Sequence, residues 1–433
     1  MLKPFALPEN LLMGSATASL QIEGGDTNNS WYAWAERGGI ADGSKTSPAA
    51  DHWNRVGQDV ALMKELKHQV YRMSLEWSRI EPEAGRFSAD ALAHYRGEIE
   101  RLIKAGIKPL VTLHHFSNPL WFENSGGWLR DDAPSVFQAY ARAVTEALGD
   151  LVSDWVTINE PNVYLTNGYV YGVWPPGRTS PKDMFAAAAN MIDAHILAYG
   201  TIHDVRSDMG RTDTMAGAAH HLRVFDPASG NPLDTLVAKL FEYLFQGLFL
   251  DGMLDGSRRL PLRRHRAALP GRVSDFLGIN YYTRDLVSFT PSARTQFGRL
   301  SVKPGSPVND LGWEIYPEGL YRLVRKYHRR YGLPVYITEN GIADRADAQR
   351  SRYLYDHLYQ LRRLADEGVD LRCYCHWTTM DNFEWMEGFT ARFGLVELDP
   401  ATQKRTVRKS GRFFAEIAAA RGVTQDMIRN YLG

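Results

Sequence analysis

The stretches DWVTINEP at residues 154–161 and PVYITENG at residues 334–341 decide how this 433-residue chain folds. Each starts as a short apolar run rich in β-branched side chains and then reaches a glutamate, Glu160 or Glu339. The first glutamate precedes proline, which cannot continue a central strand, and the second precedes Asn-Gly, which favours a turn. Each stretch therefore predicts a buried strand that ends at an acidic side chain.

Strand-like and helix-like stretches alternate along the rest of the chain. Six further apolar runs of strand length lie at residues 11–19, 69–78, 107–116, 214–222, 275–283 and 371–379. Amphipathic helical patterns are found between them at residues 56–66, 91–105, 135–148 and 351–365. Several of the strands are apolar on both faces, as in a parallel sheet covered by helices. Eight strands that alternate with helices predict an α/β fold, the (β/α)8 TIM barrel.

We expect one domain over residues 1–433, because no linker divides the chain. The longest polar insertions, at residues 24–55 and 284–312, follow the first and sixth predicted strands. Loops that follow barrel strands lie on the catalytic face, so both insertions are expected to rim the active site.

The charge balance of the chain excludes several kinds of partner. Lysine and arginine number 50, as do aspartate and glutamate, so the formal net charge is zero. This balance disfavours binding to nucleic acid or to an anionic membrane surface, since both need a basic excess. The sequence has no run of about 18 apolar residues, so no membrane span is expected. The amino-terminal stretch has no apolar core of signal-peptide length. We therefore expect a cytoplasmic protein.

The two cysteines, Cys373 and Cys375, lie two residues apart on a predicted strand. Their side chains point the same way, which is a poor geometry for a disulfide, and two buried thiols fit a reducing cytoplasm. A metal site is the alternative interpretation. It is disfavoured because no second Cys or His pair stands nearby at ligand spacing.

The acids at the two strand ends suggest a chemistry. Catalytic residues of barrel enzymes lie at the carboxyl ends of the strands, where Glu160 and Glu339 are both expected. Cleavage of a glycosidic bond needs such a pair, since one acid protonates the leaving oxygen and the other attacks or stabilises the anomeric carbon. Taken singly, either glutamate could instead cap the helix that follows it.

Six motifs together carry a family resemblance. They are GSATASLQIEG (14–24), YRMSLEWSRIEP (71–82), TINEP (157–161), NYYT (280–283), ITENG (337–341) and HWTTMDNFEWMEGFTARFGL (376–395). In this order, and over about residues 11–411, the chain resembles glycoside hydrolase family 1, the β-glucosidase family. The resemblance implies a (β/α)8 barrel that hydrolyses terminal β-D-glycosides with retention, through a covalent glycosyl-enzyme. It implies no metal and no cofactor, and a small-molecule glycoside or oligosaccharide as substrate.

The resemblance also implies roles for the reacting residues. Glu160 of TINEP is expected to be the general acid/base, and Glu339 of ITENG the nucleophile. Arg72 and Tyr282 match the residues that keep the nucleophile ionised, and Asn159 matches the residue that holds the sugar 2-OH. Alternatives are a structural ion pair for Arg72 and core packing for Tyr282; Tyr281 is the better core candidate, because neighbours on a strand face opposite ways.

A second set of residues resembles the family's sugar-binding side chains. The set comprises Gln21, His115, Glu384 and Trp385 around the sugar hydroxyls, Trp377 as the stacking platform, and Asn280 as a supporting polar contact. For Trp377 alone, core packing is the commoner role of a tryptophan. Relatives that act on 6-phosphorylated sugars replace the acid at Glu384. Because a carboxylate repels phosphate, its presence favours an unphosphorylated sugar.

The chain departs from the family pattern around the leaving-group side. HHFSNPLWF follows the third strand, Met13 precedes Gly14, and Asn162 stands where a tryptophan usually follows NEP. Tyr164 and Trp174 are the candidates to replace that tryptophan. The aglycone preference is therefore open, and we expect aryl or alkyl β-glucosides, β-fucosides and β-galactosides, with transglycosylation left open. His114 and the pair His220–His221 are interpreted as packed or hydrogen-bonded residues outside the site.

Two alternatives to a glycosidase are kept. The first is a non-catalytic sugar-binding member of the same fold, which usually lacks one of the two acids. The second is a barrel enzyme of unrelated, metal-dependent chemistry, which would need His and Asp ligands clustered at strand ends. Whether identical chains assemble is not decided by the sequence.

Overall fold

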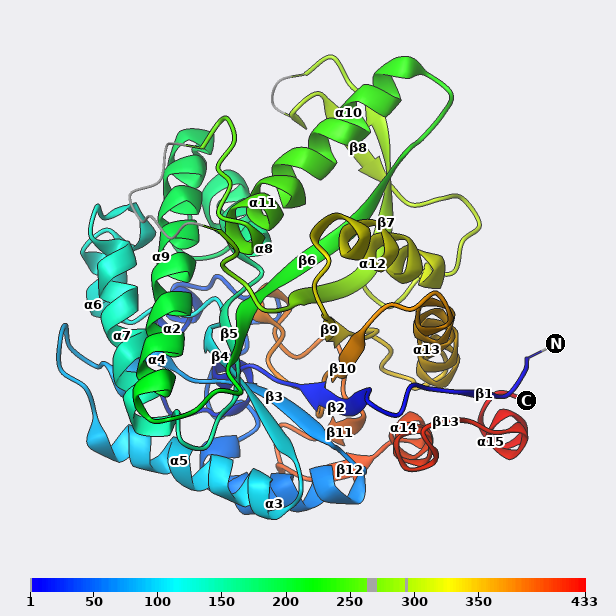
Figure 1. The fold of residues 1–433 in the computed structure, drawn as a ribbon. Helices are drawn as coiled ribbons and strands as arrows, with labels where there is room; N and C mark the ends of the chain where they lie inside the picture. The colour runs from blue at the N-terminus through cyan, green and yellow to red at the C-terminus, as the bar shows by residue number, and fades with distance from the viewer. Residues whose placement is uncertain (1, 263–270, 293–294) are drawn as a thin grey trace.

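The computed structural model describes residues 2–262, 271–292 and 295–433. Eight parallel strands close into a barrel in the order β6-β5-β4-β3-β2-β10-β9-β7, and β7 pairs again with β6 (Figure 1). The strands are β2 (Leu12–Ala16), β3 (Val70–Ser74), β4 (Lys108–His114), β5 (Asp154–Asn159), β6 (Met215–Pro227), β7 (Leu277–Phe289), β9 (Val335–Asn340) and β10 (Leu371–Trp377). Each predicted strand stretch overlaps one of them, although β6 and β7 run beyond the predicted ends, and the predicted (β/α)8 barrel is confirmed.

Helices surround the barrel (Figure 1). The longer ones are α3 (His52–Glu65), α5 (Ala89–Lys104), α7 (Ala133–Leu148), α9 (Pro181–Asp208), α10 (Pro232–Glu242), α12 (Pro317–Tyr331), α13 (Arg350–Asp366) and α14 (Lys409–Ala420). The shorter ones are α1 (Ser19–Ile22), α2 (Ser30–Glu36), α4 (Trp77–Ile80), α6 (Leu120–Asn124), α8 (Pro161–Leu165), α11 (Leu248–Leu254) and α15 (Gln425–Tyr431). Short turns are η1 (Gly127–Leu129), η2 (Thr166–Tyr171), η3 (Tyr243–Gly247) and η5 (Trp385–Glu387). All four predicted helices are found, with ends shifted by a few residues.

Local sequence signals explain where these elements begin and end. Ser88 caps α5 by accepting a hydrogen bond from the backbone N–H of Ala91. After the same helix, Gly106 takes a φ of 78°, a left-handed conformation that glycine adopts without strain. Strands β5 and β9 are buried over their whole length, which is why their sequences are apolar on both faces.

The insertion expected at residues 284–312 is only partly a loop. Strand β7 continues to Phe289 and pairs antiparallel with β8 (Gly298–Ser301), and α10 packs on the extended ends of β6 and β7 (Figure 1). Leu286, Val287 and Phe289 favour this continuation of the strand. Residues 293–294 of the insertion lie outside the described residues. The insertion at residues 24–55 contains the short helix α2.

The two ends of the chain meet at one side of the barrel (Figure 1). Strand β1 (Phe5–Ala6) pairs antiparallel with β13 (Gly422–Val423), and a second small sheet joins β11 (Val396–Leu398) to β12 (Arg405–Val407). Within the described ranges, none of the helices combines the length and the apolar character that crossing a membrane requires.

Candidate active site

A cavity of about 320 Å³ lies where the barrel strands end. Seven of the predicted site residues line it: His115, Glu160, Tyr282, Glu339, Trp377, Glu384 and Trp385. The other four, Gln21, Arg72, Asn159 and Asn280, make hydrogen bonds to this lining from behind. All the predicted site residues are therefore brought together in one place.

The backbone directs Glu160 into the cavity. This residue follows β5 directly and takes a φ of 39°, in the left-handed region, before α8 starts at Pro161. Its carboxylate makes no hydrogen bond to the backbone of α8. The helix-cap alternative is therefore wrong for Glu160, whose side chain turns to the barrel interior instead.

Both oxygens of Glu339 accept strong hydrogen bonds. The Arg72 guanidinium donates to Oε1 at 2.5 Å, and the Tyr282 hydroxyl donates to Oε2 at 2.6 Å. Burial raises the pKa of Glu339 to about 7; Arg72 opposes that rise and the Glu160 carboxylate adds to it. Tyr282 thus faces the acid, whereas its neighbour Tyr281 is fully buried, with its hydroxyl donating to the backbone of Tyr316.

Only one oxygen of Glu160 is held by the protein. Asn280 donates to Oε1 at 2.8 Å, and Nδ1 of His221 lies 3.0 Å from the same atom. No hydrogen bond from the described part of the chain reaches Oε2. The two carboxylates therefore sit in different surroundings, one with donors on both oxygens and the other with one oxygen open to the cavity.

The role of His221 was missed by the sequence. Nε of Arg223 donates to Nε2 of His221 at 3.0 Å, while Nη1 of Arg223 is paired with Asp285 at 2.9 Å. Because a guanidinium can only donate, Nε2 of His221 must accept, which places the imidazole proton on Nδ1. His221 was expected to stand outside the site, yet it lines the cavity and donates to Glu160. Its place at the carboxyl end of the fifth predicted strand was the available signal.

Asn159 links the two acids to the sugar-binding wall. Its Oδ1 accepts from Arg72 at 2.6 Å and from Asn280 at 3.0 Å, and its Nδ2 donates to Nε2 of His115 at 2.9 Å. Burial, with help from Arg72, holds the pKa of His115 well below its usual range, so this imidazole is neutral. Its Nδ1 is buried and has no protein partner in the described residues.

The sugar-binding wall also carries an amide, an acid and two tryptophan rings. Nε2 of Gln21 donates to Glu384 at 3.2 Å and to the Phe383 carbonyl at 2.8 Å, which leaves its buried Oε1 without a partner in the described structure. Burial first, and then Glu339, raises the pKa of Glu384 to about 8. The His115 ring lies nearly parallel to Trp377 and to Trp385, at 5.8 Å between centroids in both cases.

The outer part of the cavity differs from what the sequence suggested. Of the two candidates to replace the tryptophan that usually follows NEP, Trp174 lines the cavity. Tyr164 does not; it is buried, and its hydroxyl accepts a hydrogen bond from Asn118. Asn162 also points away, with its amide donating to the carbonyl of His221. Apart from His221, nine lining residues were not predicted: Phe116, Val163, Asn167, Arg223, Leu311, Trp313, Met386, Glu387 and Phe393. Of these, Leu311, Trp313 and Phe393 come from loops, whose path sequence periodicity does not reveal.

The other two histidine candidates, His114 and His220, and the two cysteines lie outside the cavity. His114 pairs with Asn118 at 2.9 Å, and His220 is buried. Cys373 and Cys375 are free thiols with their sulfurs 3.4 Å apart. Among the described residues, no group of three or more His, Cys, Asp or Glu side chains is placed to hold a metal ion.

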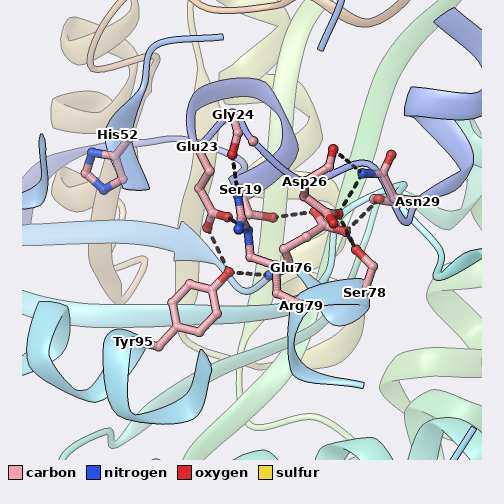
Figure 2. A network of polar contacts seen from close by, with 12 residues as sticks. Ser19, Glu23, Gly24, Asp26, Asn29, His52, Glu76, Ser78, Arg79 and Tyr95 are labelled. Atoms are coloured by element: carbon pink, nitrogen blue, oxygen red, sulfur yellow. Dashed lines mark hydrogen bonds and ion pairs between the residues drawn. The ribbon is translucent and has the colours of Figure 1, made fainter. Parts of the chain in front are cut away.

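A second cluster of buried acids lies at the end of α1, where Glu23 follows the helix, and at the start of α4, where Glu76 precedes it (Figure 2). Glu23 accepts from Arg79 and Tyr95, each at 2.8 Å. Among the described residues, the donors to the Glu76 carboxylate are three serine hydroxyls, those of Ser19, Ser78 and Ser117. Burial raises the pKa of Glu23 and of Glu76 to about 7, and Asp26 contributes to the rise at Glu76. None of these acids lines the main cavity.

A (β/α)8 barrel with two buried carboxylates, aromatic rings and unpaired polar atoms in one strand-end cavity defines the class of the glycoside hydrolases. The family model described as Glycosyl hydrolase family 1 matches residues 4–423. The chain therefore belongs to glycosyl hydrolase family 1, and the resemblance read from its motifs is confirmed.

Individual relatives agree over nearly the whole chain. Beta-glucosidase A of Thermotoga maritima is 35% identical, over 96% of this chain and 98% of that protein. A beta-galactosidase of Pyrococcus woesei is 30% identical, over 96% of this chain and 98% of that protein. A solved beta-glycosidase structure from Pyrococcus horikoshii has a TM-score of 0.92 and 37% identity, and the match covers 99% of this chain and 98% of that chain.

Proposed function

We propose that this protein is a retaining β-glycosidase that hydrolyses terminal, unphosphorylated β-D-glycosides, with Glu339 as nucleophile and Glu160 as acid/base. The observation that carries the proposal is the different hydrogen bonding of the two acids. Both oxygens of Glu339 accept from strong donors, whereas Glu160 keeps Oε2 open to the cavity.

This difference decides where a shared proton resides. Two nearby buried carboxylates do not both ionise cheaply, so the pair holds one proton near neutral pH. A proton on Glu339 would cost it a hydrogen bond from Arg72 or Tyr282, whereas Oε2 of Glu160 can carry a proton at no such cost. Glu339 is then the anion, and Glu160 is the acid.

Both chemical steps follow from this arrangement. Glu339 attacks the anomeric carbon while Glu160 gives its proton to the leaving oxygen, so the glycosidic bond breaks, the alcohol departs and a glycosyl ester forms. The ester removes the negative charge of Glu339, and Glu160, now ionised, takes a proton from water. The water oxygen attacks the anomeric carbon, the ester bond breaks, and the sugar leaves with its original configuration and both acids restored.

Unpaired polar atoms support the choice of a sugar as substrate. Nδ1 of His115 and Oε1 of Gln21 are buried without partners in the described structure, a costly state that a sugar hydroxyl relieves. Asn159 is oriented by Arg72 and Asn280, so its amide is fixed for the 2-OH. Trp377 offers a ring face for stacking.

The test is release of nitrophenol from a nitrophenyl β-D-glucoside, followed by the corresponding galactoside, fucoside and mannoside. Glu339→Ala is expected to lose at least about a thousandfold in kcat, as removal of a covalent nucleophile does. Glu83→Ala, at an exposed surface acid, is the matched control and should keep wild-type rates. Equal rates in wild type and Glu339→Ala would contradict the mechanism. Glucose binding by wild type without turnover of any β-glycoside would instead favour a sugar-binding protein.

We also propose that the protein works in a reducing, cytoplasmic compartment and that residues 1–433 act as one unit. The buried free thiols of Cys373 and Cys375 support the first point. Pairing of β1 with β13, which joins the two ends of the chain, supports the second.

A further inference from the structure

Glu76 lies just after one barrel strand and reaches the segments that follow both neighbouring strands. It comes two residues after β3, which pairs with β2 on one side and with β4 on the other. Oε2 of Glu76 accepts from the Ser19 hydroxyl at 3.0 Å (Figure 2), and Oε1 accepts from the Ser117 hydroxyl at 2.8 Å. Ser19 follows β2, and Ser117 follows β4. One carboxylate therefore joins three adjacent strand ends.

Each of these serines stands two residues from a proposed sugar-binding side chain. Ser19 opens α1 and precedes Gln21 by two positions, and Ser117 follows His115 by two positions. Gln21 and His115 are also the predicted site residues with a buried polar atom, Oε1 or Nδ1, that has no partner in the described structure. Glu76 thus links the two segments that carry these unpartnered atoms.

Glu76 occupies this place at a cost to stability. Its side chain is 1% exposed, and its donors in the described part of the chain are neutral hydroxyls rather than a cation. Burial of a carboxylate without a cation is unfavourable, and it raises the pKa of Glu76 to about 7. Local features that lower stability concentrate at functional sites, where activity depends on them.

The other end of α1 has an anchor of its own. Arg79 donates to Glu23 at 2.8 Å, and Glu23 follows Gln21 by two positions. The helix therefore stays attached to the barrel when its bond to Glu76 is removed. We expect loss of the Glu76 carboxylate to shift Gln21 within the site rather than to unfold the segment.

We propose that Glu76 is a positioning residue that holds Gln21 and His115 at the spacing at which both bind one sugar. The inference rests on the proposed sugar-binding roles of these two residues. Glu76 itself does not line the cavity, so it acts through them and not on the substrate. Hydrogen bonds weaken steeply as their geometry departs from the optimum, and a misplacement of about 1 Å can cost about a hundredfold in rate.

Two substitutions of Glu76 test the proposal with nitrophenyl β-D-glucoside as substrate. Glu76→Leu removes both acceptors, and we expect KM to rise about tenfold while kcat changes less than about threefold, because Glu160 and Glu339 stand on other strands. Glu76→Gln keeps a carbonyl that accepts from one serine and an amide that donates to the other. It should therefore return KM to within about threefold of wild type.

Ser78→Ala is the matched control. Ser78 is the third donor to Glu76, at 2.8 Å, but it adjoins neither Gln21 nor His115 in the chain. Its loss should change KM by less than about twofold. An unchanged KM in Glu76→Leu, or an equal rise of KM in Ser78→Ala, overturns the proposal.

The two serines give a test that does not depend on how Glu76→Leu folds. Ser19→Ala should act through Gln21, so it should raise the KM of wild type and of His115→Ala but change that of Gln21→Ala less than about twofold. Ser117→Ala should show the reverse dependence, with its effect lost in His115→Ala. Effects that are the same in every background would mean that Glu76 is merely structural, and they would overturn the proposal.

The single variants Gln21→Ala and His115→Ala separate this proposal from the function on which it rests. Each should raise KM, as loss of a sugar contact does. If both do so and Glu76→Leu does not, the positioning role alone fails. If neither does, the proposed sugar-binding roles fail together with the positioning role. If wild type releases no nitrophenol from any β-glycoside, it is the proposed function that fails.

Discussion

His221 donates a hydrogen bond from Nδ1 to Oε1 of Glu160 over 3.0 Å. The direction of this bond follows from the other ring nitrogen, Nε2, which accepts from Arg223 and therefore leaves the proton on Nδ1. Asn280 donates to the same carboxylate oxygen. Two donors on Oε1 leave Oε2 free of protein donors among the described residues. If Glu160 is the acid/base, as we propose, Oε2 carries the transferable proton and His221 is a positioning residue for it.

Replacement of His221 should weaken acid catalysis selectively. In His221→Phe the Glu160 carboxyl loses one donor and can turn, so its proton is less well placed. We expect kcat/KM for an alkyl β-glucoside to fall by about tenfold or more, within the range of general acid contributions. Dinitrophenyl β-glucoside, whose leaving group needs no proton, should change little. His221→Asn, which can donate in turn, should restore part of the loss. An equal loss with both substrates would mean that His221 is merely structural.

Removal of the proposed acid/base, Glu160, should produce a larger difference between alkyl glucosides and dinitrophenyl glucoside than His221→Phe does. Glu160→Ala is expected to lose about a hundredfold or more on alkyl glucosides, and much less on dinitrophenyl glucoside. Without a base to activate water, the glycosyl-enzyme should accumulate, and added azide should accelerate turnover and yield the β-glycosyl azide. Formation of the α-azide, or no response to azide, would argue against a retaining enzyme with Glu160 in this role.

Loss of Tyr282 should move the acid limb of the pH profile upwards. The phenol donates to Oε2 of Glu339 and so favours its ionised form. In Tyr282→Phe the pKa of Glu339, already raised to about 7, rises further because the carboxylate loses a hydrogen bond. A hydrogen bond to a charged group contributes about 1.5–3 kcal/mol, and one pKa unit corresponds to about 1.4 kcal/mol. The nucleophile is then protonated over a wider range, and the acid limb of kcat/KM should shift by about one pH unit towards alkali. Tyr281→Phe, whose hydroxyl faces away, is the control. An unshifted limb in Tyr282→Phe would refute this role.

The second acid cluster should make stability depend on pH (Figure 2). Burial raises the pKa of Glu76 from 4.5 to about 7, so the folded state binds more protons than the unfolded state between these values. The free energy of unfolding then falls as pH rises from 4.5 through 7, by about 3 kcal/mol for this group. Glu76→Gln removes the ionisation, so its melting temperature should exceed that of wild type at pH 8 and not at pH 4.5. Glu83→Gln, at the surface, should differ from wild type at neither pH. A gain in Glu76→Gln that is the same at both pH values would contradict the account.

Sequence patterns predicted the barrel because each strand carries its own apolar run, a local property. They located Glu160 and Glu339 because a strand-breaking signal follows each acid. They did not reveal the partner of Glu160, since His221 lies on a strand remote in sequence and only the closed barrel brings the two together. The same holds for Trp313 and Leu311, which reach the cavity from a loop that has no periodicity. The continuation of β7 to Phe289 was masked by the polar character of the stretch that follows it.

Trapping of the covalent intermediate tests the central claim most directly. A dinitrophenyl 2-deoxy-2-fluoro-β-D-glucoside reacts slowly at both steps, because fluorine destabilises the cationic transition state, while its good leaving group keeps the first step the faster one. Mass spectrometry of the digested protein should then find one sugar on the peptide that contains residues 335–340, with the ester at Glu339. The fluoroglucoside should not form an adduct with Glu339→Ala, and it should inactivate Arg72→Met more slowly than wild type. A sugar on any other residue, or turnover with no covalent adduct and with inverted configuration, would contradict the account.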